Sequence, residues 1–186
     1  MLGALLKVPL GGERSFAYLT CVQIGAYEIL YNLLLGNLPG AYYAMRKVLE
    51  GAVDITISYL KFPNKNLYDS MKKIRQRYHK FGKKCKFLRS HCGAETMEKA
   101  RELWELTSNW IHAGSLAKKF VEKIIEKVGG EGETHILPFP GSLAIPHDYD
   151  SDDVEELREL QKHLQTLRSI HSKIFQAVTR KEEDQR

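Results

Sequence analysis

Apolar residues recur along most of this chain at three- and four-residue spacings, the period of an α-helix that buries one face. The pattern predicts five long helices, at residues 15–35, 41–60, 66–89, 95–128 and from Asp150 or Ser151 to about 179. Apart from a short hairpin near Pro140, nothing in the pattern predicts paired strands. We therefore expect an all-α fold, an antiparallel bundle of about five long helices.

The chain of 186 residues has the length of one domain, and we expect a single bundle over residues 1–179. Residues 131–150 are longer than a usual connection and rich in apolar residues, which predicts a long, irregular but ordered loop before the last helix. Residues 180–186 are predicted to be a solvated tail. His171 falls on the apolar seam of the last helix, where we expect a hydrogen-bonded core histidine.

The helix at 41–60 is apolar nearly all round, which is typical of an interior helix. It nevertheless carries Arg46 and Glu50 one turn apart. The compact turn at 36–40 brings the first two helices together antiparallel and places Glu28 level with Lys47 and within one turn of Arg46. We expect a cluster of Glu28, Arg46 and Glu50. It is either an ion-pair network that fixes helix register or a catalytic or ligand-binding carboxylate pair.

The helix at 66–89 is surrounded by positive charge. Between Lys61 and His91 eight Lys and three Arg face a single acid, Asp69, whereas the whole chain carries a net charge of only +5. A basic helix binds phosphate electrostatically, and the candidate nucleic-acid-binding residues are Lys72, Lys73, Arg75, Arg77, Lys80, Lys83, Lys84 and Lys86. Candidates for base stacking in this segment are Tyr68, Tyr78 and Phe87. The alternative is that this basic face docks onto the acidic remainder of the chain within a homo-oligomer.

The sequence lacks the residue patterns of several kinds of catalytic and metal-binding site. It contains no zinc-protease or di-iron ligand spacing, no glycine-rich phosphate loop and no Gly-x-Ser-x-Gly elbow, and we expect no cofactor and no metal. The alternatives of a metal site at Cys85, His91 and Cys92, with His79, or of a Cys92 nucleophile match no standard spacing.

The cysteines and the first helix bear on where the protein resides. Three cysteines without paired spacing favour a reducing, cytoplasmic setting. Residues 16–35 form an apolar run whose only charge is Glu28, long enough to raise the alternative of a membrane span. Gln23, Glu28 and Asn32 favour a buried core helix instead, and we expect no membrane association.

Residues 25–115 resemble a loose class of uncharacterised prokaryotic helical proteins, some of them linked to abortive infection or toxin systems. The resembling elements are an Arg-x-x-x-Glu helix within 41–50 and a Ser-x-x-x-His element within 106–114, here Ser108 and His112. The resemblance implies that Arg46, Glu50 and His112 share one pocket. Projection on the helix places His112 on a polar strip with Arg101, Glu105 and Ser108, away from the core.

More distantly, such proteins resemble the higher eukaryotes and prokaryotes nucleotide-binding (HEPN) domains, many of which cut RNA. That family carries an Arg followed, after four to six residues, by a His, and Arg158 and His163 are the match here. About one such match is expected by chance in this composition.

We predict a helical protein that binds RNA or DNA, of a prokaryotic defence or toxin-like class. One alternative is a metal-independent ribonuclease with His112 or His163 as acid–base group and an Arg that stabilises the phosphorane. Another is a non-catalytic structural or partner-binding oligomer.

Overall fold

The computed structural model describes residues 12–111, 149 and 151–183 of the chain. The helices are α2 (Gly12–Leu34), α3 (Leu38–Lys61), α4 (Leu67–Arg77), α5 (Phe81–Cys92), α6 (Ala94–Ile111), the short 3-10 helix η1 (Ser151–Asp153) and α8 (Val154–Glu183). No strand occurs among these residues, so the all-α prediction is confirmed.

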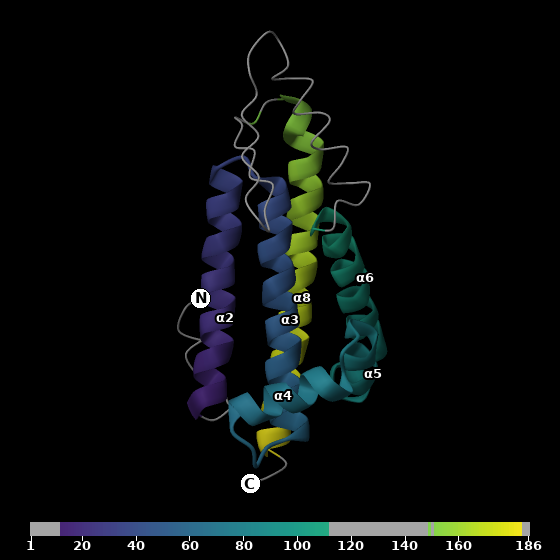
Figure 1. Cartoon of the computed structure of the whole chain (residues 1–186). Helices are drawn as coiled ribbons and strands as arrows, with labels where there is room; N and C mark the ends of the chain where they lie inside the picture. The colour runs from purple at the N-terminus through teal and green to yellow at the C-terminus, as the bar shows by residue number, and fades with distance from the viewer. Residues whose placement is uncertain (1–11, 112–148, 150, 184–186) are drawn as a thin grey trace.

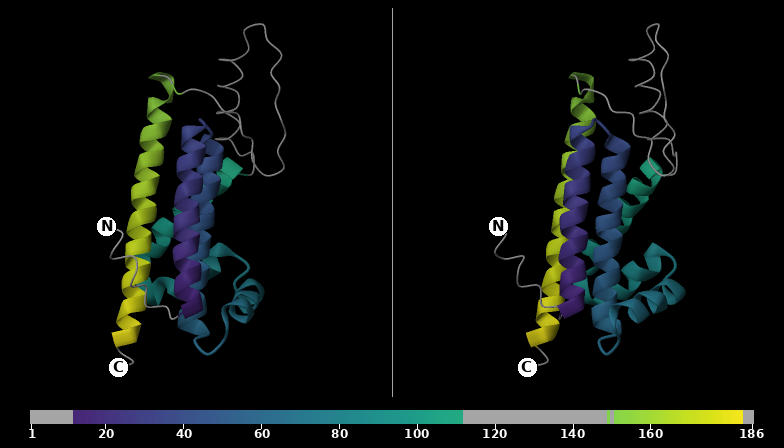
Figure 2. Two further views of the ribbon diagram at one scale, coloured as in Figure 1. Left: turned by 90° about the vertical axis from the view of Figure 1, so that its left-hand side faces the viewer. Right: turned by 60° about the vertical axis from the view of Figure 1, so that its left-hand side comes forward.

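Helix α3 lies at the centre of the bundle (Figure 1). α2, α6 and α8 run along it, α5 lies beside α6, and α4 crosses near the C-terminal end of α3 (Figures 1 and 2). Two thirds of the 24 residues of α3 are buried, because its apolar residues point in every direction. The prediction of an interior helix is therefore confirmed.

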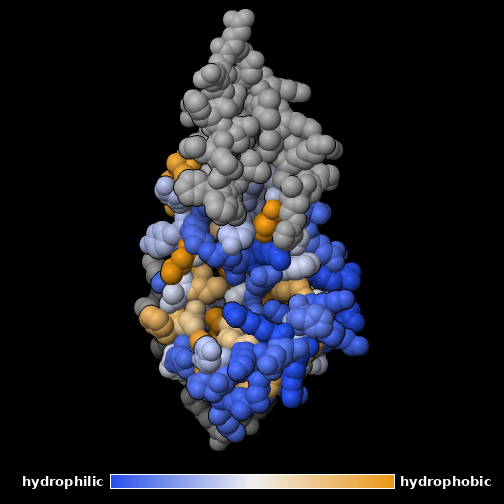
Figure 3. Space-filling model, in the orientation of Figure 1, coloured by the Kyte–Doolittle hydropathy of each residue, from blue (hydrophilic) through white to orange (hydrophobic). Residues whose placement is uncertain are grey.

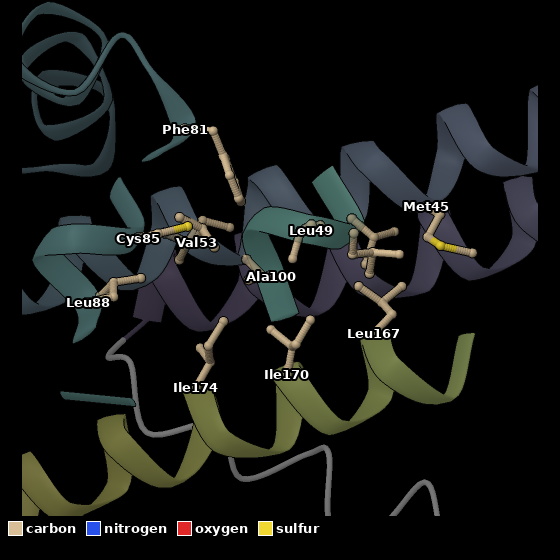
Figure 4. Close-up of a cluster of buried hydrophobic side chains, with 14 of the residues drawn as sticks. Met45, Leu49, Val53, Phe81, Cys85, Leu88, Ala100, Leu167, Ile170 and Ile174 are labelled. Carbon is tan, nitrogen blue, oxygen red and sulfur yellow. The ribbon is translucent and has the colours of Figure 1, made fainter. Parts of the chain in front are cut away.

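The core forms where four helices meet, around side chains that are almost fully buried (Figure 4). Its labelled members are Met45, Leu49 and Val53 of α3, Phe81, Cys85 and Leu88 of α5, Ala100 of α6, and Leu167, Ile170 and Ile174 of α8. Burial of such aliphatic side chains stabilises the fold by roughly 1.5–3 kcal/mol each.

The turn between α2 and α3 is fixed by buried amides. Asn37 caps α3 by accepting a hydrogen bond from the backbone N–H of Gly40 at 3.1 Å, and its Nδ2 donates to Asn32 Oδ1 at 2.7 Å. Gly36 adopts a positive φ of 68°, which glycine tolerates without strain. A Cβ on Gly40 would lie 2.1 Å from Asn32 Oδ1, so only glycine fits there.

α2 and α3 approach each other closely through small residues. A Cβ on Gly25 would lie 1.9 Å from Val48 Cγ2, and one on Gly51 would lie 2.3 Å from Cys21 Sγ. The pairing register is the predicted one, since Glu28 contacts Lys47 at 2.8 Å.

The prediction of one continuous helix at 66–89 is wrong. The segment is divided into α4 and α5, because the backbone leaves helical geometry at Tyr78 and is extended at Lys80. The turn lets Ile74 and Leu88 both reach full burial and lets Phe81 stack on Trp104, at 5.3 Å between ring centroids. Tertiary packing thus overrides a continuous helical seam.

Other boundaries also differ from expectation. Of the predicted helix at 95–128, α6 covers residues 95–111, and the remainder lies outside the described residues. The predicted loop at 131–150 also lies outside them, apart from Tyr149. α8 continues to Glu183, past residue 180 where the tail was expected, because Arg, Lys and Glu favour the helix.

α2 is buried along one side only. None of the helices in the described ranges has the length and apolarity needed to cross a bilayer. Only Tyr18, Gly25 and Ile29 of α2 are buried, whereas several large apolar side chains of this helix are exposed. The expectation that residues 16–35 form a core helix is therefore wrong for one face of α2.

Candidate functional site

The charged residues predicted to cluster between the first two helices form two separate ion pairs. Arg46 Nε lies 3.0 Å from Glu50 Oε1, one helical turn further along α3. Glu28 instead pairs with Lys47 on the surface, at 2.8 Å. The predicted three-residue cluster is therefore wrong for Glu28, because its level partner on α3 is Lys47.

Helix α6 completes the Arg46 environment with two polar groups. Arg46 Nη1 donates to Ser108 Oγ at 3.1 Å, and the indole Nε1 of Trp104 donates to Glu50 Oε1 at 2.5 Å. Ser108 Oγ in turn donates to the carbonyl of Trp104 at 2.6 Å. We call Arg46, Glu50, Trp104 and Ser108 the polar cluster, and it joins α3 to α6.

Aromatic stacking fixes the polar cluster in place. The Arg46 guanidinium lies over the Trp104 ring, 4.7 Å from its centroid, and the Phe81 ring stacks parallel to Trp104. The Arg46 side chain is only 18% exposed and that of Glu50 is 37% exposed. A charge pair held this firmly orients groups around it and stabilises the α3–α6 contact.

The polar cluster brings together the two elements that carry the sequence resemblance. Ser108 was expected on a polar strip away from the core, and this is wrong, since it is partly buried against Arg46. Arg101 and Glu105 of the same strip are exposed. His112 lies outside the described residues.

The basic residues of α4 and α5 form the second candidate site, here called the basic surface. Exposed members are Lys72, Arg75, Arg77, Lys80, Lys83 and Lys86, and Lys73 is partly exposed. Hydrophilic side chains dominate the part of the space-filling view that lies over α4, α5 and α6 (Figure 3).

Lys84 does not belong to the basic surface. Its Nζ lies 2.6 Å from Asp54 Oδ1 of α3, and the two side chains are only 13% and 18% exposed. Burial raises the pKa of the Asp54 carboxyl, and the Lys84 ammonium opposes that shift. Lys84 therefore ties α5 to α3, unlike the other predicted nucleic-acid-binding lysines, and we leave it out of the basic surface.

Like charges crowd on the basic surface. Proximity to the Lys65 ammonium lowers the pKa of Lys73. The single acid of this segment, Asp69, sits in the first turn of α4 and accepts a hydrogen bond from Asn66 Nδ2 at 3.0 Å. The positive charge of the surface is thus left largely uncompensated.

Of the three predicted stacking aromatics, Tyr68 is the most exposed. It is 77% exposed on α4. Tyr78 and Phe87 are partly buried and contact each other, with 5.7 Å between their ring centroids. Both rings therefore take part in the packing of α5 against the end of α4, and the prediction that they stack on bases stays a prediction.

Two histidines of α8 bond to tyrosines of the first two helices. His171 Nδ1 lies 2.9 Å from the Tyr18 hydroxyl, and burial lowers the pKa of His171 to about 4. The prediction of a hydrogen-bonded core histidine is confirmed. His163 Nδ1 lies 3.2 Å from the Tyr42 hydroxyl, and burial lowers its pKa as well. Arg158 is exposed.

The cysteines show no reactive arrangement within the part of the chain that the structure describes. No group of three or more His, Cys, Asp or Glu side chains there is placed to hold a metal. Burial raises the pKa of both Cys85 and Cys92 to about 11, so each thiol stays protonated at neutral pH.

Comparison with protein-family models, with curated proteins and with solved structures finds no match for this chain. The resemblance to defence-related and HEPN-like proteins therefore stays a prediction.

Sequence reasoning missed two residues of these sites. Trp104 was not singled out, although an indole four residues before Ser108 falls on the same helix face. Asp54 was not singled out either. The sequence holds no local signal for its partner, because Lys84 lies beside Lys83 and near Lys86, and only the fold distinguishes the paired lysine from the exposed ones.

Proposed function

We propose that this protein binds RNA or DNA through the phosphate backbone, at the basic surface of α4 and α5. One observation carries the proposal. Of the eleven Lys and Arg residues between Lys61 and Arg89, only Lys84 forms an ion pair with a carboxylate in the described ranges. The others present donors that a row of phosphates would satisfy.

Electrostatics favours an anionic polymer as the ligand. The Lys65 ammonium lowers the pKa of Lys73, and an anion bound beside these two side chains would offset their mutual repulsion. A polyanion that replaces several counterions at once gains affinity from their release, and such binding needs no sequence-specific contact. Tyr68 offers one exposed ring for stacking on an unpaired base.

The test measures binding of fluorescent single-stranded RNA and DNA by anisotropy, at salt concentrations of about 50–200 mM. The expected log–log plot of affinity against salt has a slope of about −0.7 for each phosphate contacted. The test variant reverses four exposed charges of the basic surface: Lys72→Glu, Arg75→Glu, Lys83→Glu and Lys86→Glu.

A matched control separates local charge from net charge. It reverses four exposed cations of α6 and α8, namely Lys99→Glu, Arg101→Glu, Lys162→Glu and Lys173→Glu. Both variants have the same net charge. We expect binding to be lost in the first and largely kept in the second. Equal loss in both, or no binding by the natural protein, would refute the proposal.

One observation favours the ribonuclease alternative. Arg46, Glu50 and Ser108, from the two elements that carry the resemblance, lie in one cluster. An arginine in such a setting is a suitable group to stabilise charge on a phosphorane. The test is cleavage of total RNA by the natural protein and by His112→Ala and His163→Ala. Cleavage that survives both substitutions excludes this alternative.

A further inference from the structure

One face of α2 presents large apolar side chains to solvent. Its members, which we call the α2 face, are between 52% and 77% exposed: Phe16, Ile24, Tyr27, Leu30, Tyr31 and Leu34. At 100° per residue these side chains all lie within about 60° of Tyr27. The strip extends from Phe16 to Leu34, about 27 Å along the helix.

The α2 face carries no charge. Between Phe16 and Leu34 the other residues on this arc are Thr20 and Gln23, whereas Arg14 and Glu28 point to other sides of the helix. Glu13 projects onto the arc one turn before Phe16, where it accepts a hydrogen bond from the backbone N–H of Leu67 at 3.1 Å. Hydrophobic patches appear on the α2 side of the space-filling view, away from the hydrophilic region over α4 and α5 (Figure 3). Contiguous apolar surface of this size marks an interaction site.

A groove adjoins the α2 face on the side of α8. α2 and α8 flank it, with Val48 of α3 between them, and its volume is about 540 Å³. Its apolar walls are formed by Val22, Ala26 and Ile29 of α2 and by Leu164, Leu167 and Phe175 of α8. Arg168, His171 and Ser172 of α8 also line the groove. The ridge of the α2 face and this groove therefore form one continuous surface that is apolar except for this part of α8.

We propose that a second copy of this chain covers this surface, with the α2 face of each copy seated against the groove of the other. A ridge and a groove side by side on one molecule are self-complementary about a two-fold axis. The contact would join α2 and α8 of one copy to α2 and α8 of its partner as a four-helix arrangement.

The exposed area matches what a stable dimer needs. If each of the six large side chains of the α2 face can bury about 150–250 Å² when fully covered, their exposed fractions offer on the order of 600–1,000 Å² per copy. Standard interfaces bury about 800 Å² per partner. The absence of charge on the face also removes the repulsion that two copies of a +5 chain would otherwise meet there.

The charge of α2 favours a protein partner over a membrane surface. Helices that lie on anionic membranes carry Lys and Arg along the polar face. α2 carries only Glu13, Arg14 and Glu28, and Arg14 is engaged within the molecule, where its Nη2 donates to the Phe62 carbonyl at 2.9 Å. The tyrosines on the α2 face suit a protein interface, in which a ring is buried and its hydroxyl finds a partner.

The experiment is the mass of the natural chain in solution, measured by light scattering after gel filtration and by sedimentation equilibrium. We expect twice the monomer mass of 21.3 kDa. Tyr27→Glu combined with Leu34→Glu places two charges in the interface and should return the mass to the monomer value. Both side chains are more than 70% exposed, so the fold should tolerate the change, which circular dichroism checks.

Tyr68→Glu is the matched control. Tyr68 is exposed to the same degree as Tyr27 but lies on α4, and this variant should remain dimeric. A natural chain that stays monomeric at about 100 µM, where an interface with a Kd of about 1 µM is saturated, overturns the proposal. A dimer that survives the double substitution also overturns the proposal. A chain that is monomeric in solution and sediments with phosphatidylserine vesicles overturns it too. No nucleic acid takes part, so the result is independent of the proposed function.

Discussion

Lowering the pH from 7 to 5 should weaken the folded state through His171. Its imidazole lies between α2 and α8, bonded through Nδ1 to the Tyr18 hydroxyl, and burial lowers its pKa from 6.5 to about 4. The other charged or titratable side chains that line the same groove are Tyr18 and Arg168, and neither is an anion that would stabilise an imidazolium. No described residue accepts a hydrogen bond from the buried Nε2.

The direction and size of the effect follow from proton linkage. Between pH 6.5 and pH 4 the unfolded chain holds a proton on His171 that the folded chain lacks, so the free energy of unfolding falls as the pH falls. The contribution is fully present above pH 6.5. This difference between the pKa of His171 in the unfolded and the folded chain corresponds to about 3 kcal/mol of unfolding free energy when the titration is complete. About 2 kcal/mol of it is lost between pH 7 and pH 5.

The assay is urea unfolding at fixed protein concentration, followed by circular dichroism at several pH values from 7 to 5. His171→Gln keeps a polar side chain that does not titrate, and its unfolding free energy should fall by about 2 kcal/mol less than that of the natural protein over this range. His79→Gln, at an exposed position, is the control and should behave as the natural protein. Equal pH dependence of the His171→Gln variant and the natural protein would refute the reasoning.

Two further predictions concern single contacts. Asp54→Ala leaves the Lys84 ammonium with little solvent and no carboxylate, and should lower the free energy of unfolding by about 3 kcal/mol. Adding Lys84→Met should restore most of the loss in urea unfolding, and no recovery would contradict a buried ion pair. Gly40→Ala forces a Cβ against Asn32 and should cost about 2 kcal/mol, seen as a lower Tm. Gly82→Ala, where the added methyl group points into open space on α5, is the control and should raise the free energy of unfolding by about 0.5–1 kcal/mol. Equal changes in Tm for Gly40→Ala and Gly82→Ala would contradict the close packing at the α2–α3 turn.

The sequence predicts those parts of the fold that depend on local pattern. The apolar circumference of α3 identifies an interior helix, and the compact turn at 36–40 sets the register that brings Glu28 to Lys47. Both follow from helical geometry and turn length, which neighbouring residues determine.

Other features depend on contacts between distant segments. The apolar seam at 66–89 continues through Tyr78 without proline, and its one glycine, Gly82, lies beyond the break, inside α5. The chain breaks near Tyr78 because Phe81 stacks on Trp104. The inward position of Ser108 depends in the same way on Arg46, a residue on another helix. The spacing of apolar residues along a helix is the same whether the core of its own chain or a partner covers them. The sequence of α2 alone therefore does not predict that the α2 face is exposed.

The close approach of α2 and α3 also bears on which helices pack first while the chain is being synthesised. Gly25 and Gly51 allow these two helices to pack within one short stretch of chain, so their contacts need little loop closure and form early. Ile174 of α8 is synthesised about 110 residues after Lys61, a delay on the order of ten seconds at ribosomal rates. During that interval the side of α3 that α8 later buries is open on the nascent chain. The α2–α3 hairpin is therefore the stage of biosynthesis at which a chaperone that binds apolar segments is expected to act.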